Sequence, residues 1–336
     1  MPFSRGLRYR AVLFSCLALM LPAVGQAATD PLAFETTRTG QAVGLAPTPG
    51  KNGMVVSAQD IASRVGADIL ARGGNAVDSA AAVAYALAVV YPAAGNIGGG
   101  GFMTLRTPDG HVTFIDFREH APGRATPTMY QDASGQVMPG ASTAGWRAVA
   151  IPGTVAGIEQ VHDRWGRLSR ADVMAPAIAL ARDGFILKQS DVDLLNLATA
   201  SFARDPYARR VFLHADGTPF VAGERLVQAD LAHTLERIAR DGARAFYNGP
   251  IAREIVNSSK KGGGILARKD FASYHTRVMA PLTCEYRGYH IDTAPPPSGG
   301  GVALCEMLNI LSGYDMHALG PVSYTHLRAH ETLRHL

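Results

Sequence analysis

The stretch NAVDSAAAVAYALAVVYPAAGNIGGGGFMTLRTPDGHVTFIDFRE, residues 75–119, decides the fold that we expect. Asn75 is a suitable helix N-cap, and Asp78 lies in the first turn, where its negative charge suits the helix dipole. From Ala76 to Val90 nearly every residue is Ala, Val or Leu. Because a helix that is apolar on all sides is typical of a core, the stretch predicts a buried helix that Pro92 ends.

A glycine run, GNIGGGG at 95–101, follows this helix. Such a run costs backbone entropy, so some feature of the fold must require it. A phosphate loop needs a following Lys and hydroxyl, whereas Phe102 and Met103 follow here. A dinucleotide loop opens a helix, whereas this run leaves one. The run therefore favours close backbone packing or a possible pocket wall of amide groups at Gly98, Gly99, Gly100 and Gly101.

A β-hairpin is predicted after the glycines, with strands at Phe102–Arg106 and His111–Phe117 and PDG as its turn. Arg118 directly follows the second strand. Arginine offers a planar fork of donors that suits a carboxylate, so Arg118 is a candidate binding residue. The alternative is a surface arginine paired with Asp116 or Glu119.

The remaining elements are short and mixed in type. "MVV" at 54–56 predicts a strand, and Ser57 with Asp60 predicts the cap of a helix that stops at Gly73. Residues 295–301 predict a turn. We also expect helices at 154–165, 170–183, 190–200, 228–240, 249–258 and 302–311, and a strand at 286–294. Strands interspersed with helices favour a layered α/β or α+β fold.

The N-terminus is typical of a secretory signal peptide over residues 1–27, because three arginines precede a short apolar run and small residues. An N-terminal membrane anchor is the alternative. Cleavage predicts a periplasmic or secreted protein with no membrane segment. It also removes three arginines and no acids, which lowers the formal charge from +4 to +1. The basic balance therefore does not indicate a nucleic-acid partner.

Two cysteines, Cys284 and Cys305, remain after cleavage. They form no CxxC pair and are too few for a zinc framework. Export would allow them to join, but nothing in their spacing places them within bonding distance. His326 and His330 are four residues apart, which would suit a metal on one helix face, but no third ligand is evident. We expect no metal and no cofactor.

Several segments together resemble the γ-glutamyltranspeptidase family, whose members are glutathione hydrolases. The resemblance runs in the family's order from about residue 52 to 319, through the opening stretch from 53 to 103 and then DFRE at 116–119, APAIALARDGF at 175–185, FYNGPIA at 246–252 and PPPSGGG at 295–301. It implies an N-terminal-nucleophile hydrolase with an αββα four-layer sandwich, incomplete in this chain.

The resemblance also implies a mechanism. A precursor cleaves itself before a Thr, whose hydroxyl then attacks the γ-glutamyl amide of glutathione or another γ-glutamyl compound, with its own α-amino group as base. Water or an acceptor amino acid takes the γ-glutamyl group. Arg118 falls on the arginine that holds the substrate's α-carboxylate. The family's Thr-Thr-His-type motif is absent, and the surroundings of Thr325 do not match it, so no catalytic residue is assigned.

We therefore expect residues 28–322 to be a large-subunit portion and residues 323–336 to be a non-family tail that is not native. The partner would be a missing small subunit from the same precursor. Without it the chain should be inactive and should expose sheet faces and edges. The alternatives are an acylase of the same family, acting on a β-lactam side chain or a polyglutamate, a non-catalytic exported carboxylate-binding protein, and a nucleotide-binding protein.

Overall fold

Helix α2 (Ala76–Val90) forms where the sequence predicts it and is a main element of the core. The Asn75 side chain accepts hydrogen bonds from the N–H groups of Val77 and Asp78, and the Asp78 carboxylate accepts one from the Asn75 N–H at 2.7 Å. This reciprocal capping box satisfies the first free N–H groups of the helix. Ala82, Tyr85, Ala86, Val89 and Val90 are almost fully buried, which confirms the predicted burial.

The computed structural model describes residues 49–316. The predicted signal peptide (1–27), the predicted tail (323–336), Thr325 and the His326–His330 pair lie outside the described residues. No helix within residues 49–316 combines the length and apolar character that a membrane span needs.

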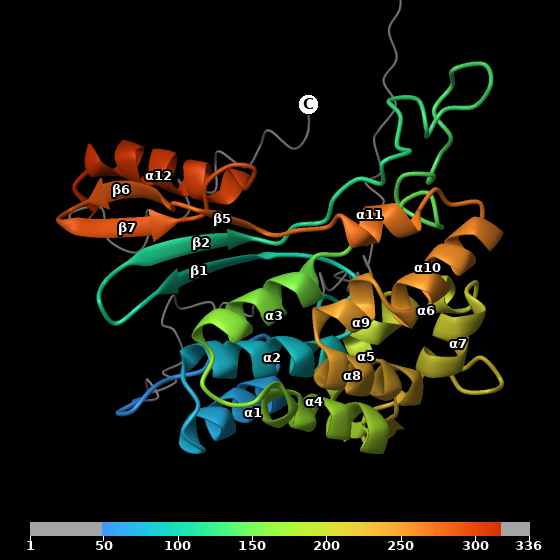
Figure 1. The fold of residues 1–336 in the computed structure, drawn as a ribbon, viewed down its shortest axis with the longest axis horizontal. Coiled ribbons are helices and arrows are strands. Elements are labelled where there is room, and N and C mark those ends of the chain that lie inside the picture. Colours follow the sequence, from blue (N-terminus) through green and yellow to red (C-terminus); the bar gives the residue numbers. More distant parts are fainter. Residues whose placement is uncertain (1–48, 317–336) are drawn as a thin grey trace, which may run out of the picture. The chain divides into compact units, whose positions relative to one another are not determined.

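The helices around α2 pack together on one side of the hairpin at residues 102–116 (Figure 1). Helix α2 packs against α1 (Asp60–Ala71), α3 (Thr154–Trp165) and α4 (Arg170–Asp183), and α4 packs against α8 (Ala229–Asp241). The predictions for α3 and α4 agree with the structure at both ends. The other described helices are α5 (Gln189–Asn196), α6 (Thr199–Phe202), α7 (Pro206–Phe212), α9 (Ala243–Tyr247), α10 (Pro250–Lys261), α11 (Arg268–Ala272) and α12 (Gly299–Ser312).

An antiparallel sheet lies along α2 and α3 (Figure 1). Its strand order is β1 (Phe102–Arg106), β2 (Val112–Asp116), β5 (Arg277–Met279), so the predicted hairpin is confirmed and a later strand joins it. Ile115 and Phe117 pack with Val77 of α2 and Val161 of α3, which fixes one face of the sheet on the helices. Smaller antiparallel pairs are β3 (Phe185–Ile186) with β4 (Arg225–Leu226), and β6 (Leu282–Tyr286) with β7 (Tyr289–Thr293).

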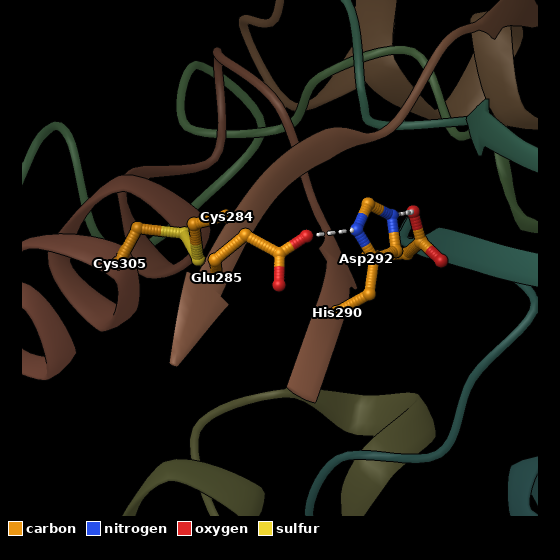
Figure 2. Close-up of a disulfide and its surroundings, with 5 residues drawn as sticks. All are labelled: Cys284, Glu285, His290, Asp292 and Cys305. Carbon is orange, nitrogen blue, oxygen red and sulfur yellow. Dashed lines mark hydrogen bonds and ion pairs between the residues drawn. A yellow bond between two sulfur atoms is a disulfide. The ribbon is translucent and has the colours of Figure 1, made fainter. Parts of the chain in front are cut away.

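A disulfide joins β6 to α12 (Figure 2). It links Cys284 to Cys305, whose Cα atoms are 6.0 Å apart, although 21 positions separate them in the sequence. The pairing that the sequence left open is therefore present. Helix α12 packs against β6, so the disulfide and this packing act on the same pair of elements.

Several predicted boundaries are wrong. Residues 54–56 form no strand, and helix α1 is capped by the Gln59 side chain, because the Ser57 hydroxyl instead donates to the Gln59 carbonyl at 2.8 Å. The single strand predicted at 286–294 is the end of one strand and the whole of the next, separated by a turn in which Arg287 and Gly288 both have positive φ (49° and 82°). Helix α12 begins inside the glycines that were predicted as a turn.

The prediction of one helix at 190–200 is also corrected, because α5 ends at Asn196 and the separate short helix α6 follows. Exposed sheet edges were expected, and within residues 49–316 both β1 and β5 lack a strand partner on their outer side. Phe102 and Val278 on these strands are exposed, as are Leu304, Met307 and Ile310 on α12. A free edge and exposed apolar side chains of this kind favour association with another chain.

Candidate functional site

Arg118 lies in a short segment that is anchored on both sides. Before it, the Phe117 N–H donates to the Gly101 carbonyl at 3.0 Å, and the Gly101 N–H donates back to Phe117 at 3.3 Å. After it, His120 and Ile151 exchange backbone hydrogen bonds of 3.1 and 2.8 Å. The backbone that carries Arg118 is therefore fixed against the glycine run and against the chain that leads into α3.

Both backbone polar groups of Arg118 are also bonded. Its N–H donates to Oδ1 of Asp116 at 2.9 Å, and its carbonyl accepts from the Tyr274 hydroxyl at 2.9 Å. Asp116 is 3% exposed, and its other carboxylate oxygen pairs with the guanidinium of Arg277. A buried carboxylate needs such a partner, so Arg277 balances the charge of Asp116 and leaves the Arg118 side chain uncommitted.

The Arg118 side chain is exposed, and within residues 49–316 its guanidinium makes no hydrogen bond or ion pair. The alternative predicted from the sequence, an arginine paired with Asp116 or Glu119, is therefore not what the structure contains. A guanidinium presents donors in a fixed planar fork that matches a carboxylate in two parallel hydrogen bonds. The side chain is thus free to bind a carboxylate.

The glycine run connects this segment to the start of α3. The Gly99 carbonyl accepts from the N–H groups of Gly153 and Thr154 at 2.6 and 3.0 Å. These are N–H groups at the helix N-terminus, which have no partner within the helix itself. The run therefore supplies a backbone acceptor to α3, an arrangement that differs from an amide cradle for phosphate.

Close packing explains two of the four predicted glycines. A Cβ at Gly100 would lie 2.6 Å from the Phe117 carbonyl oxygen, and one at Gly101 would lie 2.9 Å from the Phe117 ring. At Gly98 a Cβ would meet nothing within 4 Å. The strand that leads to Arg118 thus requires glycine at 100 and 101, which supports the packing interpretation. A pocket wall formed by Gly98, Gly99, Gly100 and Gly101 stays a prediction.

An aromatic cluster that the sequence gave no reason to expect supports Arg118 from the other side. The Tyr274 ring stacks on Tyr247, with centroids 5.3 Å apart, and lies 4.8 Å from the His120 ring. Burial, reinforced by the negative charges of Asp116 and Glu119, raises the pKa of the Tyr274 hydroxyl well above its usual value. The hydroxyl therefore stays protonated and remains a hydrogen-bond donor.

Two further groups of ionisable side chains have other roles. The Tyr85 hydroxyl donates to Glu159 at 2.7 Å, and Arg170 pairs with the same carboxylate, which ties α2 to α3 and α4. Burial raises the pKa of Glu159. On β6 and β7, Glu285 and Asp292 flank His290, whose pKa is raised mainly by its hydrogen bond to Glu285 (Figure 2).

The Tyr85 hydroxyl of the first group is enclosed in the core, because Tyr85 is 1% exposed. Within the part of the chain that the structure describes, no group of three or more His, Cys, Asp or Glu side chains is arranged to hold a metal ion. The free guanidinium of Arg118 on its fixed backbone is therefore the strongest candidate binding group.

Comparisons with known proteins identify the family to which the chain belongs. The family model for gamma-glutamyltranspeptidase matches residues 62–336. That range includes residues 323–336, and the assignment of those residues as a foreign tail stays a prediction. The chain is 53% identical over 279 residues to a glutathione hydrolase proenzyme of Pseudomonas sp. (strain A14), covering 83% of this chain and 48% of that protein.

Two other relatives extend the comparison. The crystal structure of Helicobacter pylori gamma-glutamyltranspeptidase superposes with a TM-score of 0.80 at 40% identity, covering 82% of this chain and 79% of that one. An acylase ACY 1 proenzyme of Pseudomonas sp. (strain V22) is 39% identical over 280 residues, covering 82% of this chain and 50% of that protein.

The chain spans about half the length of the curated relatives that it matches. The structural match confirms the expected fold class, of which residues 49–316 form a mixed helix-and-sheet part. The family model covers most of the chain, and the identities lie far above the level at which only the fold is shared. The chain belongs to the γ-glutamyltranspeptidase family.

Proposed function

We propose that this chain is the large-subunit portion of a γ-glutamyltransferase or glutathione hydrolase, which cleaves γ-glutamyl amides and transfers the γ-glutamyl group to water or to an amino acid. The observation that carries the proposal is the free guanidinium of Arg118 on a segment whose backbone is fixed on both sides. A γ-glutamyl group keeps its α-carboxylate free, and two parallel hydrogen bonds to Arg118 would orient it.

The reaction itself would need a second segment. A Thr at the N-terminus of a small subunit would attack the γ-carbonyl carbon and expel the amine, which takes up a proton, to leave an ester-linked γ-glutamyl enzyme. Water or an amino acid would then attack the ester and release the Thr. Relatives of the chain are named as proenzymes, which supports a precursor that yields two subunits. Arg118 contributes binding and orientation to this scheme.

The proposed location is the periplasm or the exterior of the cell. It rests on the predicted signal peptide over residues 1–27. The Cys284–Cys305 disulfide supports it, because disulfides persist in oxidising compartments and are rare in reducing ones.

A second candidate function is that of an acylase in the same family. The 39% identical acylase ACY 1 proenzyme favours it. Such an enzyme would hydrolyse the acyl side chain of a β-lactam or a polyglutamate. The two functions differ in the substrate.

An activity assay separates these functions. The chain would be mixed or coexpressed with a complementing small subunit and assayed on a γ-glutamyl anilide and on a β-lactam that carries an acyl side chain. We expect turnover of the anilide only when the small subunit is present. Preferential turnover of the β-lactam would favour the acylase. Calorimetric binding of glutamate to the chain without turnover in any combination would indicate a carboxylate-binding protein and overturn the proposal.

A further inference from the structure

We propose that the segment 274–277 positions Arg118 for the substrate carboxylate, with the Tyr274 hydroxyl as the principal positioning group. The inference rests on the proposed function of Arg118 and adds residues that lie far from it in the sequence. The Tyr274 hydroxyl donates to the backbone carbonyl of Arg118, so Tyr274 is a positioning residue that acts through Arg118.

Tyr274 and Arg277, at the two ends of this segment, fix the backbone carbonyl and the backbone N–H of Arg118. Tyr274 donates to the Arg118 carbonyl at 2.9 Å. Arg277, at the start of β5, pairs with the buried carboxylate of Asp116, which accepts the Arg118 N–H at 2.9 Å. Arg277 and Asp116 are also opposite one another in the β2–β5 register. Rotation of the backbone at Arg118 would therefore break a hydrogen bond on one side or the other.

The position of the Tyr274 hydroxyl is itself determined by its surroundings. Its ring stacks on Tyr247, whose hydroxyl donates to the Pro152 carbonyl at 2.8 Å and accepts from the Ala156 N–H at 3.2 Å. A Cβ at Gly153 would lie 2.0 Å from the Tyr274 hydroxyl. Glycine at 153 therefore leaves the space that this hydroxyl occupies.

The consequence for binding follows from the length of the arginine side chain. A small change in the backbone direction at Arg118 moves the guanidinium much further than it moves Cα. Bidentate pairing depends on orientation as well as distance, and a misplacement of about 1 Å in a binding group can have large effects on a reaction. Loss of the Tyr274 hydrogen bond should therefore weaken substrate binding while the chemical step is kept.

The test uses Tyr274→Phe in the complete precursor, with Tyr207→Phe as the matched control, because Tyr207 is exposed and lies on α7. Removing one hydrogen bond should raise KM for a γ-glutamyl anilide by about two- to tenfold. The value of kcat should stay within about twofold, since the change affects binding. Tyr207→Phe should change neither constant. Thermal unfolding of each variant checks that the fold is retained.

A double variant with Arg118→Gln makes the test specific. If Tyr274 acts through Arg118, adding Tyr274→Phe to Arg118→Gln should cause no further rise in KM. An equal rise in both backgrounds, or a fall in kcat with KM unchanged, would indicate a general structural role and overturn the inference. Unchanged KM in Tyr274→Phe with raised KM in Arg118→Gln would overturn the inference alone, whereas unchanged KM in Arg118→Gln would overturn the proposed function.

Discussion

Alanine at Gly100 should lower the stability of the fold, whereas alanine at Gly98 should leave it unchanged or raise it slightly, although both glycines belong to the same run. At Gly100 the added Cβ would lie 2.6 Å from the Phe117 carbonyl oxygen and 2.8 Å from the Glu119 nitrogen, and both of these are backbone atoms. Restoring an ordinary contact requires a shift of about 0.8 Å in a well-packed segment. Adding volume to a well-packed segment typically lowers the free energy of unfolding by about 1–3 kcal/mol.

At Gly98 the same methyl group meets nothing within 4 Å, and neither glycine has a positive φ. Gly98→Ala should therefore be neutral or slightly stabilising, by up to about 1 kcal/mol, because alanine lowers the entropy of the unfolded chain. Thermal unfolding of the chain followed by circular dichroism is the assay. With about 2–4 °C per kcal/mol for a domain of this size, Gly100→Ala should lower Tm by roughly 2–12 °C.

The kinetic consequence distinguishes packing from ligand contact. The Phe117 carbonyl that Gly100→Ala would displace directly precedes Arg118, so this variant of the complete precursor should also raise KM. Equal losses of Tm in the two variants, or a stable Gly100→Ala, would refute the packing argument. A raised KM in Gly98→Ala with an unchanged Tm would instead support the predicted pocket wall.

Other predictions concern the ionisable groups and the disulfide. Reduction of the disulfide that joins β6 to α12 should cost about 3 kcal/mol for a loop of this length, and amide exchange in α12 should accelerate, whereas unchanged exchange would contradict this. By NMR, the pKa of His290 should lie above that of an ordinary histidine, and Glu285→Gln should lower it. Its charge should stabilise the fold below the pKa of the unfolded state, and this effect should be lost as pH rises through the folded pKa. Tyr85→Phe should cost about 1–3 kcal/mol in urea unfolding, because Glu159 loses a buried donor, and a neutral result would refute that role.

Local patterns predicted the elements that are long or strongly marked. Helix α2 carries a capping box and an apolar surface on all sides, and the hairpin has alternating residues around a turn, so both follow from short-range rules. Two-residue strands such as β3 and the short helix α9 have no such signal, because they depend on packing with distant segments. The Ser57 cap failed because a neighbouring side chain competed for the same helix end.

In the site too, local features could be predicted from the sequence and long-range contacts could not. Arg118 was recognisable from its place after a predicted strand and from the DFRE motif. Its free guanidinium depends on Arg277, which neutralises Asp116 across 161 positions of sequence. The contact from Tyr274 spans 156 positions, and no spacing rule connects residues so far apart. The candidate binding residue could therefore be proposed from the sequence, whereas the residues that hold its backbone could only be found in the structure.

The central claim is that Arg118 binds the α-carboxylate of a γ-glutamyl group. The most direct measurement compares wild-type precursor and Arg118→Gln on a γ-glutamyl anilide and on the 4-aminobutyryl anilide, which lacks only that carboxylate. The wild type should prefer the γ-glutamyl substrate in kcat/KM by roughly 10- to 150-fold, the range expected for hydrogen bonds to a charged group. The account predicts that Arg118→Gln loses most of this preference. A variant that retains it in full would contradict the account.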